Sequence, residues 1–573
     1  MSTATGTTAH RVPGHRTPSH RAETPAEQRR HAHVLAGTGR LARQILRRDR
    51  RRMLIWAAVM SVFIAYFAVA LSTVFDASAL AARAAVMRTP SGIVMGGPGY
   101  GLDDYTPLVA VANEGTTWIV MALSVMAILH VVRHTRAEEE SGRAELVRAG
   151  AVGRMAPAVA TLATLAAHLL VIAVLSALAT FASQGEDTSL VDGLGLMLAS
   201  AASALVFGAA ALVVAQIVST SRGAVGLSLA VFGAAFAVRS AGDLIALEGS
   251  TLSWFSPLAW AQQMRAFVDL RWWPLLLSSA ATAALLGLAS ALAARRDLGQ
   301  GMVPARPGHP GAPGRLRGPV AMAWRQQRAM LGWCSLGLGL LWFGSGSMLD
   351  ALGDMATDLV AETPALGALF GEDPDGFITS FLAVIMLSVA LCAGAYAIVA
   401  THQQCRGEES SGRLELVLAA PVSRTGWFAA QLAVALAGAA VLLAVCVGAI
   451  WAGAALVGVT EPGSGEYATV FATHLPAVLS FAAVSALLYG WAPRLAGLSW
   501  LLLSAVLVIG MFGAMFEFPE AVLGISPFHW VPAPFAATEG GDLARTLGLS
   551  VVVLALLVLA LLGFRRREIR SGS

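Results

Sequence analysis

The chain of 573 residues is 56% hydrophobic and only 13% charged, with a mean hydropathy of +0.67. Soluble globular proteins are about half apolar and about a quarter charged, so an ordinary water-soluble fold is excluded. The formal net charge is +4, and all 39 basic residues are arginine. Without lysine the chain can form neither the P-loop that binds ATP nor a Schiff base. We therefore expect it to have no catalytic residues of its own.

The amino-terminal residues, 1–39, are rich in Thr, Pro, His and Arg and are predicted to form a disordered tail. The basic stretch that follows, 40–52, has two open interpretations: an interfacial helix on anionic headgroups, or a solvated flank of the first apolar segment. No signal peptide is indicated, because the tail is too long and too polar.

Twelve apolar segments of spanning length follow in chain order, and they predict an all-α polytopic membrane protein with about twelve transmembrane helices. The first set covers roughly residues 53–75, 107–132, 156–182, 191–219, 223–247 and 273–294. The second set covers roughly residues 330–349, 377–401, 426–457, 471–491, 495–516 and 547–564. The predicted domains are a six-helix half (40–296), a Pro- and Gly-rich flexible linker (297–319), a second six-helix half (320–564) and a basic tail (565–573).

A charged sequence occurs twice, each time after the second apolar segment of a half. The first island runs from Arg136 to Arg154, and the second island runs from Arg406 to Arg424, an offset of 270 (406 − 136). Twelve of the nineteen aligned positions are identical, whereas composition alone predicts roughly one or two. The chain is therefore interpreted as a fused duplication of two parallel six-helix repeats, since an even number of spans preserves orientation.

A second motif, Ser-Pro-x-x-Trp, recurs with the same offset between the fifth and sixth apolar segments of each half. Its proline breaks a helix and its tryptophan suits a membrane interface. It is either an outer gate that lines an exit or a structural turn with an aromatic anchor, and both interpretations stay open. Its residues are Ser256, Pro257 and Trp260 in the first half and Ser526, Pro527 and Trp530 in the second.

Arginines flank the apolar segments on one side, whereas Asp and Glu gather in the loops of the other side. The positive-inside rule then places both islands, the linker and both termini in the cytoplasm, with the spans in the plasma membrane. A topological signal needs only arginine, and not an ordered Glu-Glu-x-x-Gly-Arg-x-Glu-Leu pattern retained twice. The islands are thus interpreted as docking surfaces rather than solvated loops, each a short helix that begins near its glutamate pair.

This pattern after the second span resembles the permease subunits of ABC-2 type exporters, in particular fused double-length permeases of actinobacteria that export polyketide antibiotics (tetronasin-type) or multiple drugs. The resemblance implies that the islands are coupling helices, which dock on two copies of a separate ATPase subunit that holds ATP and Mg²⁺. It also implies a hydrophobic or amphipathic drug as cargo, with no nucleic acid as a partner. Among the positions that differ between the islands, Arg148 against Leu418 and Ala151 against Pro421 make the two docking surfaces unequal. The docking residues implied are Glu138, Glu139, Gly142, Arg143 and Glu145 in the first island and Glu408, Glu409, Gly412, Arg413 and Glu415 in the second.

Two other function classes remain. One is a secondary drug transporter of the major facilitator type, which also has six plus six spans. In that family the loop after the second span contains an Asp-Arg dipeptide, which this chain lacks. The other class is a membrane scaffold that transports nothing. Charged or titratable residues within spans, Arg239, His168 and His474, are candidates for a substrate pathway, and Arg239 is predicted to pair with Asp243. The four cysteines have no metal-ligand spacing, so neither a metal nor a cofactor is predicted.

Overall fold

The computed structural model describes residues 34–185, 188–297, 299–303, 311, 314, 316–350, 353, 374–513, 518–535 and 540–568. Within these residues every regular element is a helix, and twelve helices are long and apolar enough to cross a membrane. The predicted all-α polytopic fold is therefore confirmed. Most of the predicted disordered tail (1–33) and much of the predicted linker lie outside the described residues.

Each apolar segment predicted in the first half falls on one long helix, and the second segment begins in the short α5 (Pro107–Ala110) and a π-helical turn (Val111–Gly115) that continue into its long helix. The long helices are α2 (Thr38–Val74), α6 (Thr116–His134), α9 (Ala156–Gln184), α10 (Leu190–Ile217), α11 (Ser221–Ile245) and α13 (Pro274–Ala293). The basic stretch 40–52 forms the first turns of α2, continuous with the span. It contains neither Gly nor Pro and is rich in Arg and Leu, which favour helix, so nothing interrupts the helix before the apolar segment.

The second half repeats this arrangement after the linker. Its long helices are α14 (Pro319–Gly346), α17 (Pro374–Ile398), α20 (Arg424–Leu456), α21 (Ser464–Trp491), α22 (Leu498–Phe512) and α24 (Gly540–Arg566). In both halves the first of the six helices packs on the third, and the fourth packs on the second and the sixth. The same order of elements therefore builds the same neighbours twice.

Small residues allow these helices to approach closely. At Gly453 of α20, an added Cβ would lie only 2.2 Å from the carbonyl oxygen of Phe343 in α14. At Gly490 of α21, an added Cβ would lie 2.6 Å from the carbonyl oxygen of Ala560 in α24. Helices in a membrane gain little from burying apolar surface against each other, so close backbone packing at glycine is the usual source of their association.

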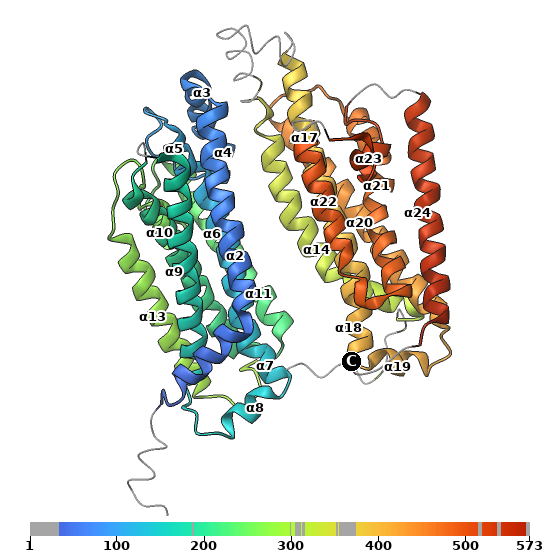
Figure 1. The fold of residues 1–573 in the computed structure, drawn as a ribbon, viewed down its shortest axis with the longest axis horizontal. Coiled ribbons are helices and arrows are strands. Elements are labelled where there is room, and N and C mark those ends of the chain that lie inside the picture. Colours follow the sequence, from blue (N-terminus) through green and yellow to red (C-terminus); the bar gives the residue numbers. More distant parts are fainter. Residues whose placement is uncertain are drawn as a thin grey trace, which may run out of the picture.

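The two bundles lie side by side with separate interiors (Figure 1). Among the described residues, each cluster of buried apolar side chains falls within one half of the chain. The halves touch where α4 (Pro90–Met95) meets α14, and there the hydroxyl oxygens of Ser91 and Ser347 are 2.7 Å apart. Each half is thus packed around its own core.

Both islands lie at the same end of the molecule, at the bottom of Figure 1, where the labels α7, α8, α18 and α19 are grouped. We refer to this as the island end. The short helices α3 (Ala77–Met87), α4 and α23 (Glu520–Leu523) lie at the opposite end. The shared orientation of the islands agrees with an even number of membrane crossings between them.

Candidate functional site

A glycine divides each island into two short helical pieces. In the first island α7 (Arg136–Glu140) is followed by α8 (Arg143–Arg148), and in the second island α18 (Gln404–Ser410) is followed by α19 (Arg413–Leu418). Gly142 and Gly412 both have φ of 72°, a left-handed conformation that glycine adopts without steric cost. The prediction that a single short helix begins at each glutamate pair therefore needs correction, because the exposed helix begins after the glycine.

The helix that follows each glycine, α8 or α19, exposes charged side chains and one leucine to solvent. Leu146 is 78% exposed and Leu416 is 76% exposed, and both lie outside the membrane-spanning helices. The flanking arginine and glutamate of each helix are exposed as well. An exposed leucine flanked by charges of both signs matches the mixed apolar and polar composition of a protein interface. We call this surface the island tip: Arg143, Glu145 and Leu146 in the first island, and Arg413, Glu415 and Leu416 in the second.

The second glutamate of the first island points away from the tip. The carboxylate of Glu139 accepts hydrogen bonds from Arg296 at 2.7 and 2.9 Å and from Arg136 at 2.6 Å. Arg136 is only 1% exposed, and it also donates to the carbonyl oxygens of Gly299 and Gln300. Glu139 therefore fixes the chain that follows α13 to the base of the first island.

The second island uses its second glutamate in the same way. Glu409 forms an ion pair with Arg567 and accepts a hydrogen bond from the Tyr489 hydroxyl at 2.8 Å. Arg567 follows α24 as Arg296 follows α13, so in each half an arginine after the sixth span is bound by the island. Sequence reasoning missed both arginines. Their offset of 271 (567 − 296), close to that of the islands, is the signal that was available.

The first glutamates of the two pairs have different partners. Glu138 binds Arg48 of α2 at 2.6 Å, whereas Glu408 binds Arg413 of its own island at 3.1 Å. Arg148, whose counterpart in the second island is Leu418, lines a cavity of about 100 Å³ beside Glu139. Desolvation in that position lowers the pKa of the Arg148 guanidinium. The two islands thus share a backbone but differ in their attachments.

The Ser-Pro-x-x-Trp motifs form compact turns at the opposite end. The hydroxyl oxygen of each serine accepts a hydrogen bond from a backbone N–H two residues on, which caps α12 (Pro257–Gln262) and the 3₁₀ turn Pro527–Trp530. The indole of Trp260 donates to the carbonyl oxygen of Trp254 at 2.7 Å, and that of Trp530 donates to Gly524 at 3.0 Å. These local bonds favour the structural-turn interpretation, and the gate stays a prediction.

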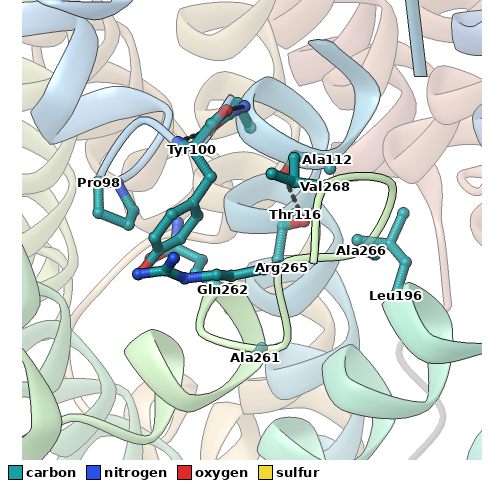
Figure 2. A pocket seen from close by; sticks show the side chains of 11 residues that line it. Pro98, Tyr100, Ala112, Thr116, Leu196, Ala261, Gln262, Arg265, Ala266 and Val268 are labelled. Atoms are coloured by element: carbon teal, nitrogen blue, oxygen red, sulfur yellow. Dashed lines mark hydrogen bonds between the residues drawn. The ribbon is translucent and has the colours of Figure 1, made fainter. Parts of the chain in front are cut away.

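The first of these turns is packed against its surroundings (Figure 2). The Gln262 amide donates to the carbonyl oxygen of Gly96 at 2.8 Å and to Thr117 at 2.9 Å. The Arg265 guanidinium lies 4.3 Å from the centre of the Tyr100 ring, and burial raises the pKa of the Tyr100 hydroxyl. The cavity among these side chains measures about 10 Å³, room for about one water molecule. No drug-sized opening exists at this place in the structure.

The predicted pair of Arg239 and Asp243 is confirmed, with 3.4 Å between their side chains. Arg239 is fully buried, and it also donates to the carbonyl oxygens of Ile93 at 3.0 Å and Val94 at 2.6 Å, near the end of α4. A guanidinium that satisfies the last carbonyls of a helix holds that helix in place. Through these contacts Arg239 has a structural role, because it connects α11 to α4.

The two histidines proposed for a substrate pathway are both buried. His168 lies 3.1 Å from the carbonyl oxygen of Met53, and His474 lies 3.1 Å from that of Val470. His168 lines a cavity of about 300 Å³ between α2 and α6, whereas the His474 ring stacks on Phe528 of the second Ser-Pro-x-x-Trp motif. A pathway role remains a prediction for both.

Two comparisons with known proteins bear on this architecture. A family model described as the C-terminal domain of the multidrug efflux system permease Rv1217c matches residues 43–293 and 316–565. The multidrug efflux system permease protein Rv1217c of Mycobacterium tuberculosis strain H37Rv is 36% identical over 545 residues. That alignment covers 93% of this chain and 95% of the relative, so it includes both islands and nearly all the spans.

Proposed function

The chain belongs to the family of the multidrug efflux system permease Rv1217c, and from that membership we propose that it is the membrane permease of an exporter powered by ATP hydrolysis on a separate subunit. Within that class we assign it to the fused, double-length ABC-2 type permeases, which its island sequence resembles. The cargo is a hydrophobic or amphipathic drug or antibiotic, in keeping with spans built mainly from Ala, Leu and Val.

The observation that carries this proposal is the pair of island tips. Each tip presents the same arginine, glutamate and leucine on a helix that begins after a left-handed glycine, and both tips lie at one end of the molecule. Two like surfaces on one chain suit two copies of one partner, and we identify this partner as the ATPase subunit. ATP, Mg²⁺ and the catalytic lysine then belong to the partner, since this chain contains no lysine.

The island end is assigned to the cytoplasm, together with both termini and the linker. Arginine is concentrated at that end, around the islands and after α13 and α24, and the positive-inside rule concerns such residues near the ends of spans. This orientation brings the tips to the compartment that holds ATP. The motifs at the opposite end then face the outside of the plasma membrane.

ATP dependence separates this proposal from a secondary transporter. In inside-out vesicles that contain the permease and its ATPase, we expect ATP to drive uptake of an amphipathic fluorescent drug, and vanadate to abolish that uptake. Dissipating the proton gradient with an ionophore should leave the initial rate unchanged. The matched control is an ATPase subunit whose Walker A lysine is replaced. Uptake driven by a pH gradient without ATP would support the major facilitator alternative, and no uptake under either condition would support a scaffold.

A further inference from the structure

A cluster of titratable side chains at the island end of the first half has no role in the function proposed above. α2 contributes Asp49, and α6 contributes His130 and His134, which are one helical turn apart. One nitrogen or oxygen of each residue lies within 4.8 Å of those of the other two. We propose that Asp49, His130 and His134 bind one divalent transition-metal ion of the Zn²⁺ class.

Hydrogen bonding presents a free ring nitrogen of His130 to the cluster. The Thr164 hydroxyl donates to the carbonyl oxygen of Thr161 at 2.9 Å, so its oxygen is left to accept from Nε2 of His130 at 3.3 Å. When Nε2 of a neutral imidazole carries the proton, Nδ1 has a lone pair for a metal. That Nδ1 is the atom that faces Asp49, at 3.9 Å.

The His134 ring lies between two carboxylates, with one ring nitrogen near each of them. Its Nε2 lies 2.6 Å from Oδ2 of Asp49, and its Nδ1 lies 3.8 Å from a carboxylate oxygen of Glu138. A metal would replace the proton between Nε2 and Oδ2 and widen that separation, while Glu138 would accept the N–H on the other side of the ring. A carboxylate behind a ligating imidazole is a common arrangement, because it fixes the ring and raises its basicity.

The ligand types point to the Zn²⁺ class. Two imidazole nitrogens and one carboxylate oxygen favour Zn²⁺, Co²⁺ or Ni²⁺ over Mg²⁺ or Ca²⁺, which prefer oxygen alone. Three protein ligands leave a fourth position for water. A cavity of about 300 Å³, lined by Asp49 and His130, gives that position room and an access route. Arg133 lies 3.5 Å from Oδ1 of Asp49, so it leaves Oδ2 for the metal.

The second half offers no equivalent cluster at the aligned positions. His130 and His134 align with Ala400 and Gln404 at the island offset of 270. The first helices of the two halves align at an offset of 277 (330 − 53), because Met53 and Trp56 match Met330 and Trp333. Asp49 then aligns with Gln326, which accepts a hydrogen bond from the amide of Gln431 at 2.9 Å. One chain should therefore bind one ion, which would fasten α2 to α6 directly beside the contact of Glu138 with Arg48.

Cobalt binding to the full-length chain tests this proposal. The protein is purified without a polyhistidine tag, and the five histidines of the tail are replaced by glutamine so that they bind no metal (His10, His15, His20, His31 and His33). We expect one equivalent of Co²⁺ to produce the visible absorption bands of a four-coordinate site, and Zn²⁺ to displace it. Loss of even an outer partner of a metal ligand lowers affinity about 10–100-fold, so Asp49→Asn or His134→Gln should lower it at least that much.

The matched control is His168→Gln, which changes a histidine in the same cavity that is not among the three ligands and should leave Co²⁺ affinity unchanged. Size-exclusion chromatography and circular dichroism establish that each variant is folded. The proposal is overturned if the parent binds no stoichiometric Co²⁺, a result that does not depend on any variant. It is also overturned if folded His130→Gln and His134→Gln proteins bind Co²⁺ as tightly as the parent.

Discussion

Exchanging the charges of Arg143 and Glu145 is expected to release the ATPase copy that docks on the first island and to abolish export, without lowering the abundance of the permease. Both side chains are exposed, and exposed ion pairs contribute only about 0–1 kcal/mol to stability. At a docked interface each reversed charge meets a like charge, and disrupting such pairs costs about 2–5 kcal/mol of binding, or about 30- to 4,000-fold in affinity. The measurements are co-purification of the ATPase and efflux of drug from intact cells.

The same exchange at Arg413 and Glu415 tests the second island, where it also places a carboxylate beside Glu408, the ion-pair partner of Arg413. The two results are therefore not expected to be equal, and the islands differ at Arg148 and its counterpart as well. A matched control exists at the opposite end, where Arg88 and Asp103 form an exposed ion pair 2.6 Å apart. Exchanging their charges should affect neither ATPase association nor efflux. Full association and full efflux in both island variants would mean that the islands are topological loops.

Glu139→Gln is expected to cost about 3–5 kcal/mol of stability, because it leaves the buried charges of Arg136 and Arg296 without a carboxylate. Thermal unfolding of the purified permease and its abundance in membranes measure this loss. Glu145→Gln, an exposed neighbour in the same island, serves as the control and should change stability by less than about 1 kcal/mol.

A double variant, Glu139→Gln with Arg296→Gln, should recover part of the lost stability, because fewer unpaired charges then remain buried. Glu409→Gln tests the corresponding contact in the second half, where Arg567 is the partner. If Glu139→Gln unfolds at the same temperature as Glu145→Gln, the glutamate does not anchor the island and its contacts with the arginines contribute nothing measurable.

The sequence predicted the spans well because a membrane helix must be long and continuously apolar, and this can be read segment by segment. The turns at Ser256 and Ser526 were also readable, since their capping bonds and indole bonds lie within six residues. The partners of the island glutamates could not be predicted from the sequence. Glu139 and Arg296 are 157 residues apart, and only the packing of α10 against both α6 and α13 brings their ends together.

The islands show the same limit. One docking role was predicted for all their marked residues, but the contacts divide them into exposed tips and anchored glutamates, because helical spacing cannot say which charges meet an arginine from another helix. The metal-ligand cluster was missed for a similar reason. The His130–His134 spacing is visible in the sequence, whereas Asp49 joins it only through the tertiary fold, in which α2 and α6 both pack on α9.

One chain that carries two docking surfaces for a separate ATPase is the central feature of the proposed function. Native mass spectrometry of the complex purified from membranes measures this directly. We predict a mass equal to one copy of this 59.3 kDa chain plus two copies of one P-loop ATPase, with loss of one ATPase copy in each island variant. A complex with two copies of this chain, or a transport-active chain that binds no ATPase, would contradict the account.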